Sequence, residues 1–194
     1  MELVIIDYGA GNVQSVKYAL NRLGIDATLS NDPATIKSAD KIIFPGVGAA
    51  GPAMEALKEN GIDELIPTLT QPVLGICLGM QLMCTHSEEG NVMGLGIIDV
   101  NVQKFIGEAK IPHMGWNNVS KLKSSLFEGF STEDQLYFVH SYYVPVNEFT
   151  IAECDYIQNF SAAIQKDNFY ACQFHPEKSG DVGEQLLKKF IALP

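Results

Sequence analysis

The 194-residue sequence is short of basic side chains and of long apolar runs. Lys and Arg total 13 against 23 Asp and Glu, so the formal net charge is −10 at pH 7. This acidic balance argues against a nucleic-acid backbone or an anionic membrane as the main partner. No run approaches the roughly 18 apolar residues of a transmembrane helix, and the first residues lack the basic start of a signal peptide. We therefore expect a cytoplasmic protein that binds neither nucleic acid nor membrane.

Cysteine is also scarce, and its spacing argues against two common uses. The chain has four cysteines, with no Cys-x-x-Cys pair and no Cys/His spacing typical of structural zinc. Reduced thiols in or near a core are therefore expected, with no disulfide and no metal site. The four are Cys77, Cys84, Cys154 and Cys172.

Linkers, repeats and low-complexity segments are absent as well, which predicts a single domain spanning residues 1–194. In the first half, apolar runs at 3–6, 41–44 and 73–76 alternate with helical patterns. Such alternation indicates an α/β fold with a mainly parallel, doubly wound sheet. Strand candidates at 135–139, 150–155, 161–165 and 169–174 then follow without intervening helices, and they predict an antiparallel or mixed extension of the same sheet. A helix from about residue 181 closes the chain.

Three strand-to-helix turns are candidates for chemistry, because doubly wound sheets bind ligands at the carboxyl ends of their strands. The first, residues 9–11, lacks the third glycine of a dinucleotide-binding fingerprint. The second, residues 46–51, matches G-x-G-x-x-G, but Pro45 precedes it and no acidic residue at the tip of the next strand could hold a ribose. Its backbone N–H groups are better suited to a developing negative charge.

The third turn has the layout of a nucleophile elbow. Residues 75–79 read Gly-Ile-Cys-Leu-Gly, between a short apolar strand and a helical segment running through Leu82. The glycines relieve crowding around a sharply turned Cys77, and the start of the following helix would favour a thiolate. The alternative for Cys77 is a buried, inert thiol at a tight turn.

A thiol nucleophile needs a base, and His175 is the best placed of the four histidines. It follows a predicted strand and precedes Pro176, which favours extended geometry at His175. Side chains two apart in an extended segment point to the same side, so Glu177 can reach the imidazole and fix its tautomer. The elbow cysteine and the oriented histidine together predict a cysteine triad.

These residues resemble the triad type of class I glutamine amidotransferases, and within that class the glutaminase subunits of imidazole glycerol phosphate synthases. The resemblance covers nearly the whole chain and implies a flavodoxin-like domain. Ala50, where Phe is common, and residues 83–85 depart from the usual pattern without touching the triad. The motifs that carry it, in the expected order, are residues 6–12, 45–48, 75–81, 112–117, 138–142 and 174–179.

The resemblance implies that glutamine is hydrolysed through a glutamyl thioester, without a cofactor or metal. Cys77 would attack the carboxamide, His175 would transfer the proton and Glu177 would orient His175. The expected oxyanion donors are backbone N–H groups, at Leu78 and at either Val47 or Gly48.

The family pattern also implies which residues hold the α-amino and α-carboxylate groups of L-glutamine. Of these, Glu89 stays open, because in its polar loop it reads equally well as a solvated charge. The implied residues are Gly48, Gln81, Glu89, His140, Ser141 and Tyr142.

The same resemblance implies a partner, a separate cyclase subunit with a (β/α)8 barrel, in a heterodimer. The cyclase would use the ammonia for imidazole glycerol phosphate synthesis in histidine biosynthesis. One domain of this length leaves no room for the half that uses ammonia, which agrees with a two-part enzyme. The positions implied to face the cyclase are Asn12, Trp116, Tyr137 and Lys178.

Four alternatives stay open at this point. A class I glutaminase could serve a different synthase, since the triad does not separate such enzymes. A Cys-elbow hydrolase or peptidase would act without a partner. A nucleotide-binding module would use residues 46–51 with Cys77 inert, and an interaction subunit would be catalytically silent.

Overall fold

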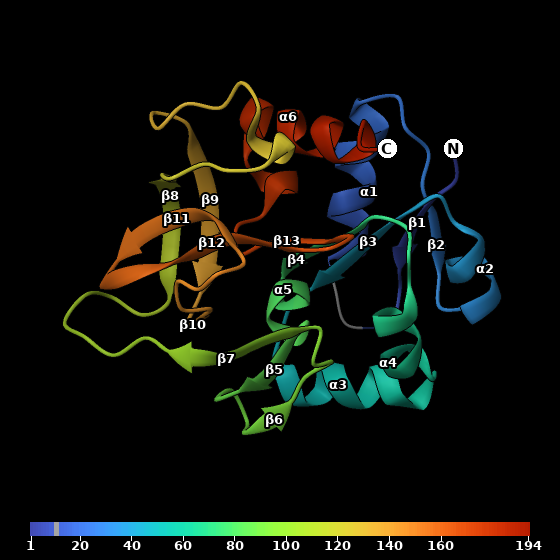
Figure 1. Ribbon diagram of the computed structural model, residues 1–194, viewed down its shortest axis with the longest axis horizontal. Coiled ribbons are helices and arrows are strands. Elements are labelled where there is room, and N and C mark those ends of the chain that lie inside the picture. The colour runs from blue at the N-terminus through green and yellow to red at the C-terminus, as the bar shows by residue number, and fades with distance from the viewer. Residues whose placement is uncertain (10–11) are drawn as a thin grey trace.

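A seven-stranded sheet forms the centre of the computed structural model, which describes residues 1–9 and 12–194 (Figure 1). The strand order is β11-β12-β13-β4-β3-β1-β2, and the pairs from β13 to β2 are parallel. This confirms the predicted α/β class with a mainly parallel sheet. The turn at 9–11 lies partly outside the described residues. The parallel strands are β1 (Leu3–Ile6), β2 (Thr28–Ser30), β3 (Lys41–Gly46), β4 (Val73–Cys77) and β13 (Phe169–Cys172).

Helices cover both faces of this sheet, as a doubly wound fold requires. Successive residues of β1 point into opposite cores: Leu3 and Ile5 pack with α1 and α6, whereas Val4 and Ile6 pack with α2, α3 and α4. The two layers lie on opposite sides of the sheet in Figure 1. The helices are α1 (Val13–Arg22), α2 (Pro33–Ser38), α3 (Ala50–Glu59), α4 (Ile62–Leu65), α5 (Leu78–Leu82) and α6 (Gly180–Ile191), with 3-10 turns η1 (Ile66–Thr68), η2 (Ser125–Phe127) and η3 (Pro176–Lys178).

The predicted extension of the sheet is right for three of its four strands, β13 among them, and wrong for the fourth. Strands β11 (Thr150–Tyr156) and β12 (Gln158–Lys166) add antiparallel to β13. Strand β9 (Gln135–His140) instead pairs with β8 (His113–Asn118) in a separate hairpin. The reason lies in its alternation of buried and less buried residues, which suits a ribbon with one face on a core.

A third, four-stranded sheet was not predicted. It packs beside α3 and α5 and has the order β10-β7-β5-β6. Its strands are β5 (Cys84–Ser87), β6 (Val92–Met93), β7 (Ile98–Lys104) and β10 (Tyr142–Tyr143). Strand β10 directly follows β9, so this sheet and the hairpin meet at residues 140–142.

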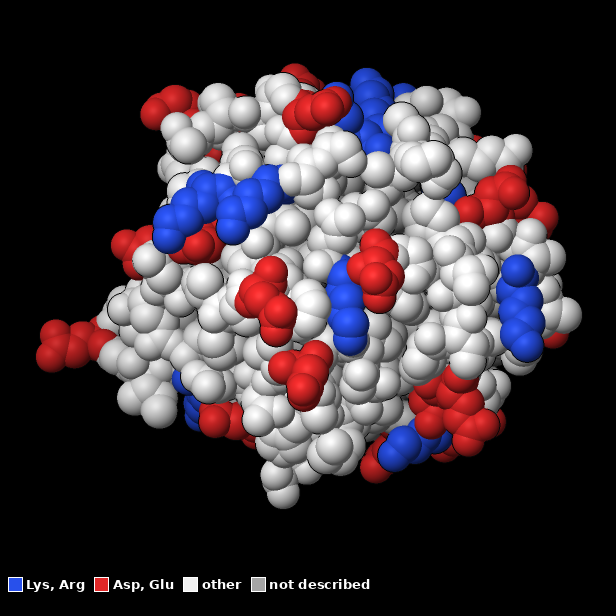
Figure 2. Space-filling model, viewed as in Figure 1, with Lys and Arg blue, Asp and Glu red and all other residues white. Residues whose placement is uncertain are grey.

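Two surface properties complete the description. Acidic and basic side chains are dispersed among one another over the face shown in Figure 2. Within the described part of the chain, no helix is long and apolar enough to cross a membrane.

Candidate active site

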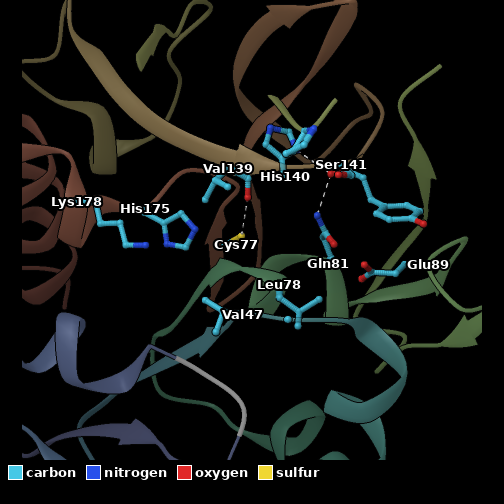
Figure 3. Close-up of a pocket in the computed structure, with 13 residues that line it drawn as sticks. Val47, Cys77, Leu78, Gln81, Glu89, Val139, His140, Ser141, His175 and Lys178 are labelled. Atoms are coloured by element: carbon cyan, nitrogen blue, oxygen red, sulfur yellow. Dashed lines mark hydrogen bonds between the residues drawn. The ribbon is translucent and has the colours of Figure 1, made fainter. Parts of the chain in front are cut away.

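A cavity of about 310 Å³ opens at the carboxyl ends of β3 and β4, where a doubly wound sheet is expected to bind a ligand. Figure 3 shows Cys77 at its centre, with His175 beside the sulfur and Val47 and Leu78 on the opposite wall from Val139 and His140. Of its lining, Pro112 and Val139 were not among the predicted site residues. The lining residues are Val47, Gly48, Cys77, Leu78, Gln81, Glu89, Pro112, Val139, His140, Ser141, Tyr142, His175 and Lys178.

Cys77 occupies a strained turn between β4 and α5, as the elbow pattern predicted. Its φ of 54° and ψ of −107° are rarely adopted by residues other than glycine. The turn needs a glycine at position 79, because a Cβ there would lie 2.0 Å from the carbonyl oxygen of Phe44. The backbone thus closes tightly against β3 and leaves the Cys77 side chain at the cavity.

His175 and Glu177 form a buried pair beside this sulfur. His175 Nδ1 lies 2.8 Å from Glu177 Oε1, with both side chains almost wholly buried. Burial alone lowers the pKa of His175, but hydrogen bonds to Cys77 and Glu177, together with their charges, outweigh it and raise the pKa to about 9. The site therefore favours an imidazolium at neutral pH.

The β8–β9 hairpin anchors the segment that carries His175. The backbone N–H of His175 donates to the carbonyl of Tyr137 at 2.8 Å. The Ser179 hydroxyl donates to the carbonyl of His175 at 2.7 Å and accepts from the N–H of Tyr137 at 2.9 Å. Strand β9, misplaced by the sequence prediction, is thus what holds the histidine in position.

The predicted oxyanion donors lie along the wall below Cys77. Leu78 is the first residue of α5, where a backbone N–H has no partner within the helix. Val47 is partly exposed directly after β3, and Gly48 has a φ of +95° with open space at its Cβ position. Gly48 is therefore needed for its backbone conformation and not for close packing.

Two glutamine side chains, one from α5 and one directly after β13, form a hydrogen-bonded chain that ends at the nucleophile. Gln81 Nε2 donates to the carbonyl of Tyr142 and to Gln173 Oε1, both at 2.9 Å. Gln173 Nε2 in turn donates to Cys77 Sγ at 3.7 Å. Gln173 was missed in the sequence, although it lies two residues before His175.

His140 lines the cavity, but both of its ring nitrogens are bonded within the protein. Nδ1 lies 2.8 Å from the carbonyl of Tyr142, and Nε2 lies 3.0 Å from His113 Nδ1. Burial lowers the pKa of His140 to about 3 and that of His113 to about 4. The neutral His140 ring therefore has no free nitrogen for a ligand, and the pairing with His113 was not predicted.

Glu89 is fixed at the edge of the cavity. Its Oε2 accepts the backbone N–H of Ala50 at 2.9 Å, at the first turn of α3. Partial burial raises the pKa of this carboxyl, and the bond from Ala50 partly offsets the rise. Of the two sequence interpretations, the contacts favour an ordered cavity residue over a freely solvated charge.

The four residues predicted to face a partner subunit lie in three separate parts of the structure. Lys178 is exposed and lines the cavity. Trp116, 52% exposed, packs edge-on against Tyr137 across the hairpin, with ring centroids 5.8 Å apart, outside the lining. Asn12 precedes α1 and accepts a hydrogen bond from Ser15 Oγ at 2.7 Å.

The chain belongs to the class-I glutamine amidotransferase family, whose model matches residues 4–193. The fold agrees: one solved glutamine amidotransferase has a TM-score of 0.77 at 18% identity, covering 97% of this chain and 96% of that chain. PurLQS from Thermotoga maritima has a TM-score of 0.76 at 15% identity, covering 98% and 97%.

Within this family, imidazole glycerol phosphate synthase subunits named HisH match this chain over their full length. The chain is 60% identical to the subunit of Bacteroides fragilis strain YCH46 and 50% identical to that of Escherichia coli strain K12. In both cases 100% of each chain is covered. This chain is therefore a member of the HisH group of glutamine amidotransferases.

Proposed function

We propose that this chain is the glutaminase subunit of an imidazole glycerol phosphate synthase, in which Cys77, His175 and Glu177 release ammonia from glutamine. The observation that carries the proposal is the strained Cys77 beside a buried His175–Glu177 pair, within a cavity of a chain of the HisH group. The four cysteines are free, which suits a cytoplasmic enzyme.

The raised pKa of His175 sets the order of proton transfers. With the proton already on the imidazole, the Cys77 thiolate attacks the carboxamide carbon of glutamine. His175 then gives this proton to the departing nitrogen, and ammonia leaves as the glutamyl thioester forms. His175, now neutral, takes a proton from water, whose attack releases glutamate and restores the thiolate.

The wall below Cys77 would stabilise the tetrahedral oxyanion. Leu78 offers a backbone N–H at the start of α5, and the turn at Val47 and Gly48 is the second source. Exposure of Val47 leaves this turn free to be reoriented by a bound partner. Preorganised donors of this kind are worth roughly 10²–10³ in rate each.

The far end of the cavity would hold the amino-acid end of glutamine. Among the described residues only the Nε2 of Gln81 is hydrogen-bonded, which leaves its Oε1 available, and the carboxylate of Glu89 lies on the same side in Figure 3. These oxygens suit an α-ammonium group. Gly48, Ser141 and Tyr142 complete this end with backbone and hydroxyl groups, whereas His140 supports it from behind.

The ammonia would pass to a cyclase subunit bound over the hairpin. Met114 and Trp116 are exposed on the same side of β8, and Lys178 stands at the cavity mouth. A partner that covered these apolar side chains would also close the cavity from water, which keeps ammonia unprotonated.

Replacement of Cys77 by alanine tests the proposal. In the complex with a cyclase subunit, Cys77→Ala should abolish synthesis from glutamine and leave synthesis from added ammonia unchanged. Cys84→Ala is the matched control, since Cys84 is buried in another core and should leave both activities unchanged. Glutamine-dependent synthesis that survives Cys77→Ala would overturn the assignment of the nucleophile.

A further inference from the structure

Gln173 is a buried polar side chain to which the mechanism above gives no task. It follows directly after β13, and the register that pairs Cys172 with Ile76 places it beside Cys77. Its exposed fraction is 0%, and both ends of its amide are engaged. Oε1 accepts from Gln81, and Nε2 donates to the sulfur of Cys77.

The orientation of both amides is set by one carbonyl group. The oxygen of Tyr142 can only accept, so the amide group of Gln81 that faces it at 2.9 Å must be the NH₂. That NH₂ also faces Gln173, which must then present its oxygen to Gln81. The remaining end of Gln173, the NH₂, is left facing the sulfur.

Further contacts hold this arrangement in place. His140 Nδ1, 2.8 Å from the same Tyr142 oxygen, must also be a donor, so its Nε2 accepts from His113. A flip of either glutamine amide would bring two donors or two acceptors together in a site with little access to water. Buried networks in which every donor and acceptor is paired in only one orientation are rigid for this reason.

We propose that Gln173 is a positioning residue that holds the Cys77 sulfur through an N–H donor and, through Gln81, links the nucleophile to the end of the cavity that binds the amino acid. The link to substrate binding rests on the proposed function. The contact to the sulfur does not, because it concerns the reactivity of the thiolate alone.

The surroundings of the sulfur show why a neutral donor matters there. The carbonyl oxygen of Val139 lies 4.0 Å from Cys77 Sγ and disfavours a negative sulfur. The titratable groups in the surroundings are His175, backed by Glu177, together with Tyr8 and Cys172; the pKa of Tyr8 and of Cys172 is raised mainly by burial, so both stay neutral. His175 supplies the positive charge, and Gln173 supplies a donor on a second side.

Alkylation of Cys77 by iodoacetamide, followed by mass spectrometry across a pH series, tests this contact. A hydrogen bond to a charged group is worth enough that Gln173→Leu should slow alkylation at pH 7 roughly tenfold. The half-maximal rate should also move to higher pH. Burial raises the pKa of Cys84 and Cys154 to about 12, so these thiols should stay unlabelled.

Gln165→Leu is the matched control. Gln165 lies on β12 opposite Tyr170, toward the amino end of β13 and away from Cys77. The alkylation profile of Cys77 in Gln165→Leu should therefore equal that of the parent protein. Gln173→Met keeps a similar side-chain length and adds no charge but removes the donor, and it should slow alkylation as well. This second variant decides the matter if Gln173→Leu does not fold.

Unchanged alkylation profiles in Gln173→Met, or in a folded Gln173→Leu, would overturn the proposal. In the assembled complex, kcat for glutamine should fall more than KM rises, because the donor acts on the sulfur. Alkylation needs no glutamine, so its result stands even if Cys77→Ala shows the proposed function to be wrong. Conversely, a normal profile in Gln173→Leu leaves the result of Cys77→Ala untouched.

Discussion

Two buried histidines flank the cavity, and their neighbours give them different charge states, one cationic and one neutral. His175 is 2% exposed and His140 is 6% exposed. Burial lowers the pKa of both, yet that of His175 rises to about 9 and that of His140 falls to about 3. The difference is the partner: His175 faces a thiol and a carboxylate, whereas His140 faces a carbonyl and a second imidazole.

This contrast suits one histidine to the proton transfer proposed above and the other to fixed geometry. A group with a pKa near 9 holds a proton at neutral pH and can deliver it to a leaving group. A histidine that stays neutral between two hydrogen bonds keeps one tautomer and thereby orients what it bonds. His140 therefore orients the Tyr142 carbonyl, while His175 holds the proton that the proposed mechanism transfers.

Of the changes that test this difference between the two histidines, Glu177→Gln should have the largest effect. The amide removes the negative charge behind His175, so the imidazole should lose its proton nearer neutral pH and glutamine hydrolysis should fall on the order of 10³-fold. Glu177 Oε2 is buried with no hydrogen-bond partner among the described residues, so Glu177→Gln breaks no hydrogen bond to that oxygen. Steady-state glutaminase kinetics of the assembled complex measure the loss.

Two outcomes are informative in this experiment. Ammonia-dependent synthesis should be unaffected, which separates a damaged triad from a damaged complex. Glutaminase activity within a few fold of the parent would show that the carboxylate charge does not set the state of His175. Glu153→Gln is a control, since Glu153 lies on β11, outside the cavity, and forms an ion pair with Lys121.

The arrangement of Cys77, His175 and Glu177 was predictable because its signals are local. The glycines around Cys77 indicate a turn that passes close to Phe44, and His175 is extended before Pro176, as predicted. Glu177 lies in the 3-10 turn η3 and not in extended backbone, so its contact with His175 was predicted correctly but the extended geometry expected for it was wrong. Both signals can be recognised within a few residues of the chain. The alternation in β9 was equally local and correctly predicted a strand.

The rest of the site depends on pairings between distant segments. Gln173 reaches Cys77 only because β13 pairs with β4, and His113 meets His140 only because the two are opposite each other in the hairpin. The partner of β9 could not be inferred from its own pattern. The four-stranded sheet, which was not predicted, has one recognisable strand pattern in the sequence, the alternation of Ile98, Val100 and Val102 in β7. Its other strands are too short to show a periodicity.

The difference between the two histidines can also be tested through the pH dependence of folding stability. The pKa of His175 is raised when folded, so its contribution to stability is fully present below its unfolded value near 6.5 and is lost as pH rises through about 9. The pKa of His140 is lowered when folded, so the unfolded state takes up a proton that the folded state refuses. Its contribution is present above pH 6.5 and is lost as pH falls toward about 3.

Urea unfolding of the parent, His175→Asn and His140→Asn at several pH values measures both effects. The stability of the parent relative to His140→Asn should fall by on the order of 1 kcal/mol between pH 7 and pH 5. Relative to His175→Asn, it should fall instead between pH 7 and pH 9. Parallel curves in either range would mean that the histidine concerned has the same proton affinity folded and unfolded.

The smallest effect is expected at the outer end of the neutral pair. Asn117 Nδ2 donates to His113 Nε2 at 3.3 Å and to the carbonyl of Asp155 at 3.1 Å. Asn117→Ala removes the donor to His113, but the bond from His113 Nδ1 to His140 still fixes the tautomer. KM for glutamine should therefore rise only about twofold, because one long hydrogen bond is lost at the edge of the network.

The neighbouring Asn118→Ala is the matched control for this measurement. Asn118 is exposed on the same strand and donates to the carbonyl of Thr132, away from the histidines, so KM should not change. A rise of tenfold or more with Asn117→Ala would show that the His113–His140 pair is held from its outer end. Orientation of the Tyr142 carbonyl would then depend on Asn117, on the same strand as the exposed Trp116, and not on the buried imidazoles alone.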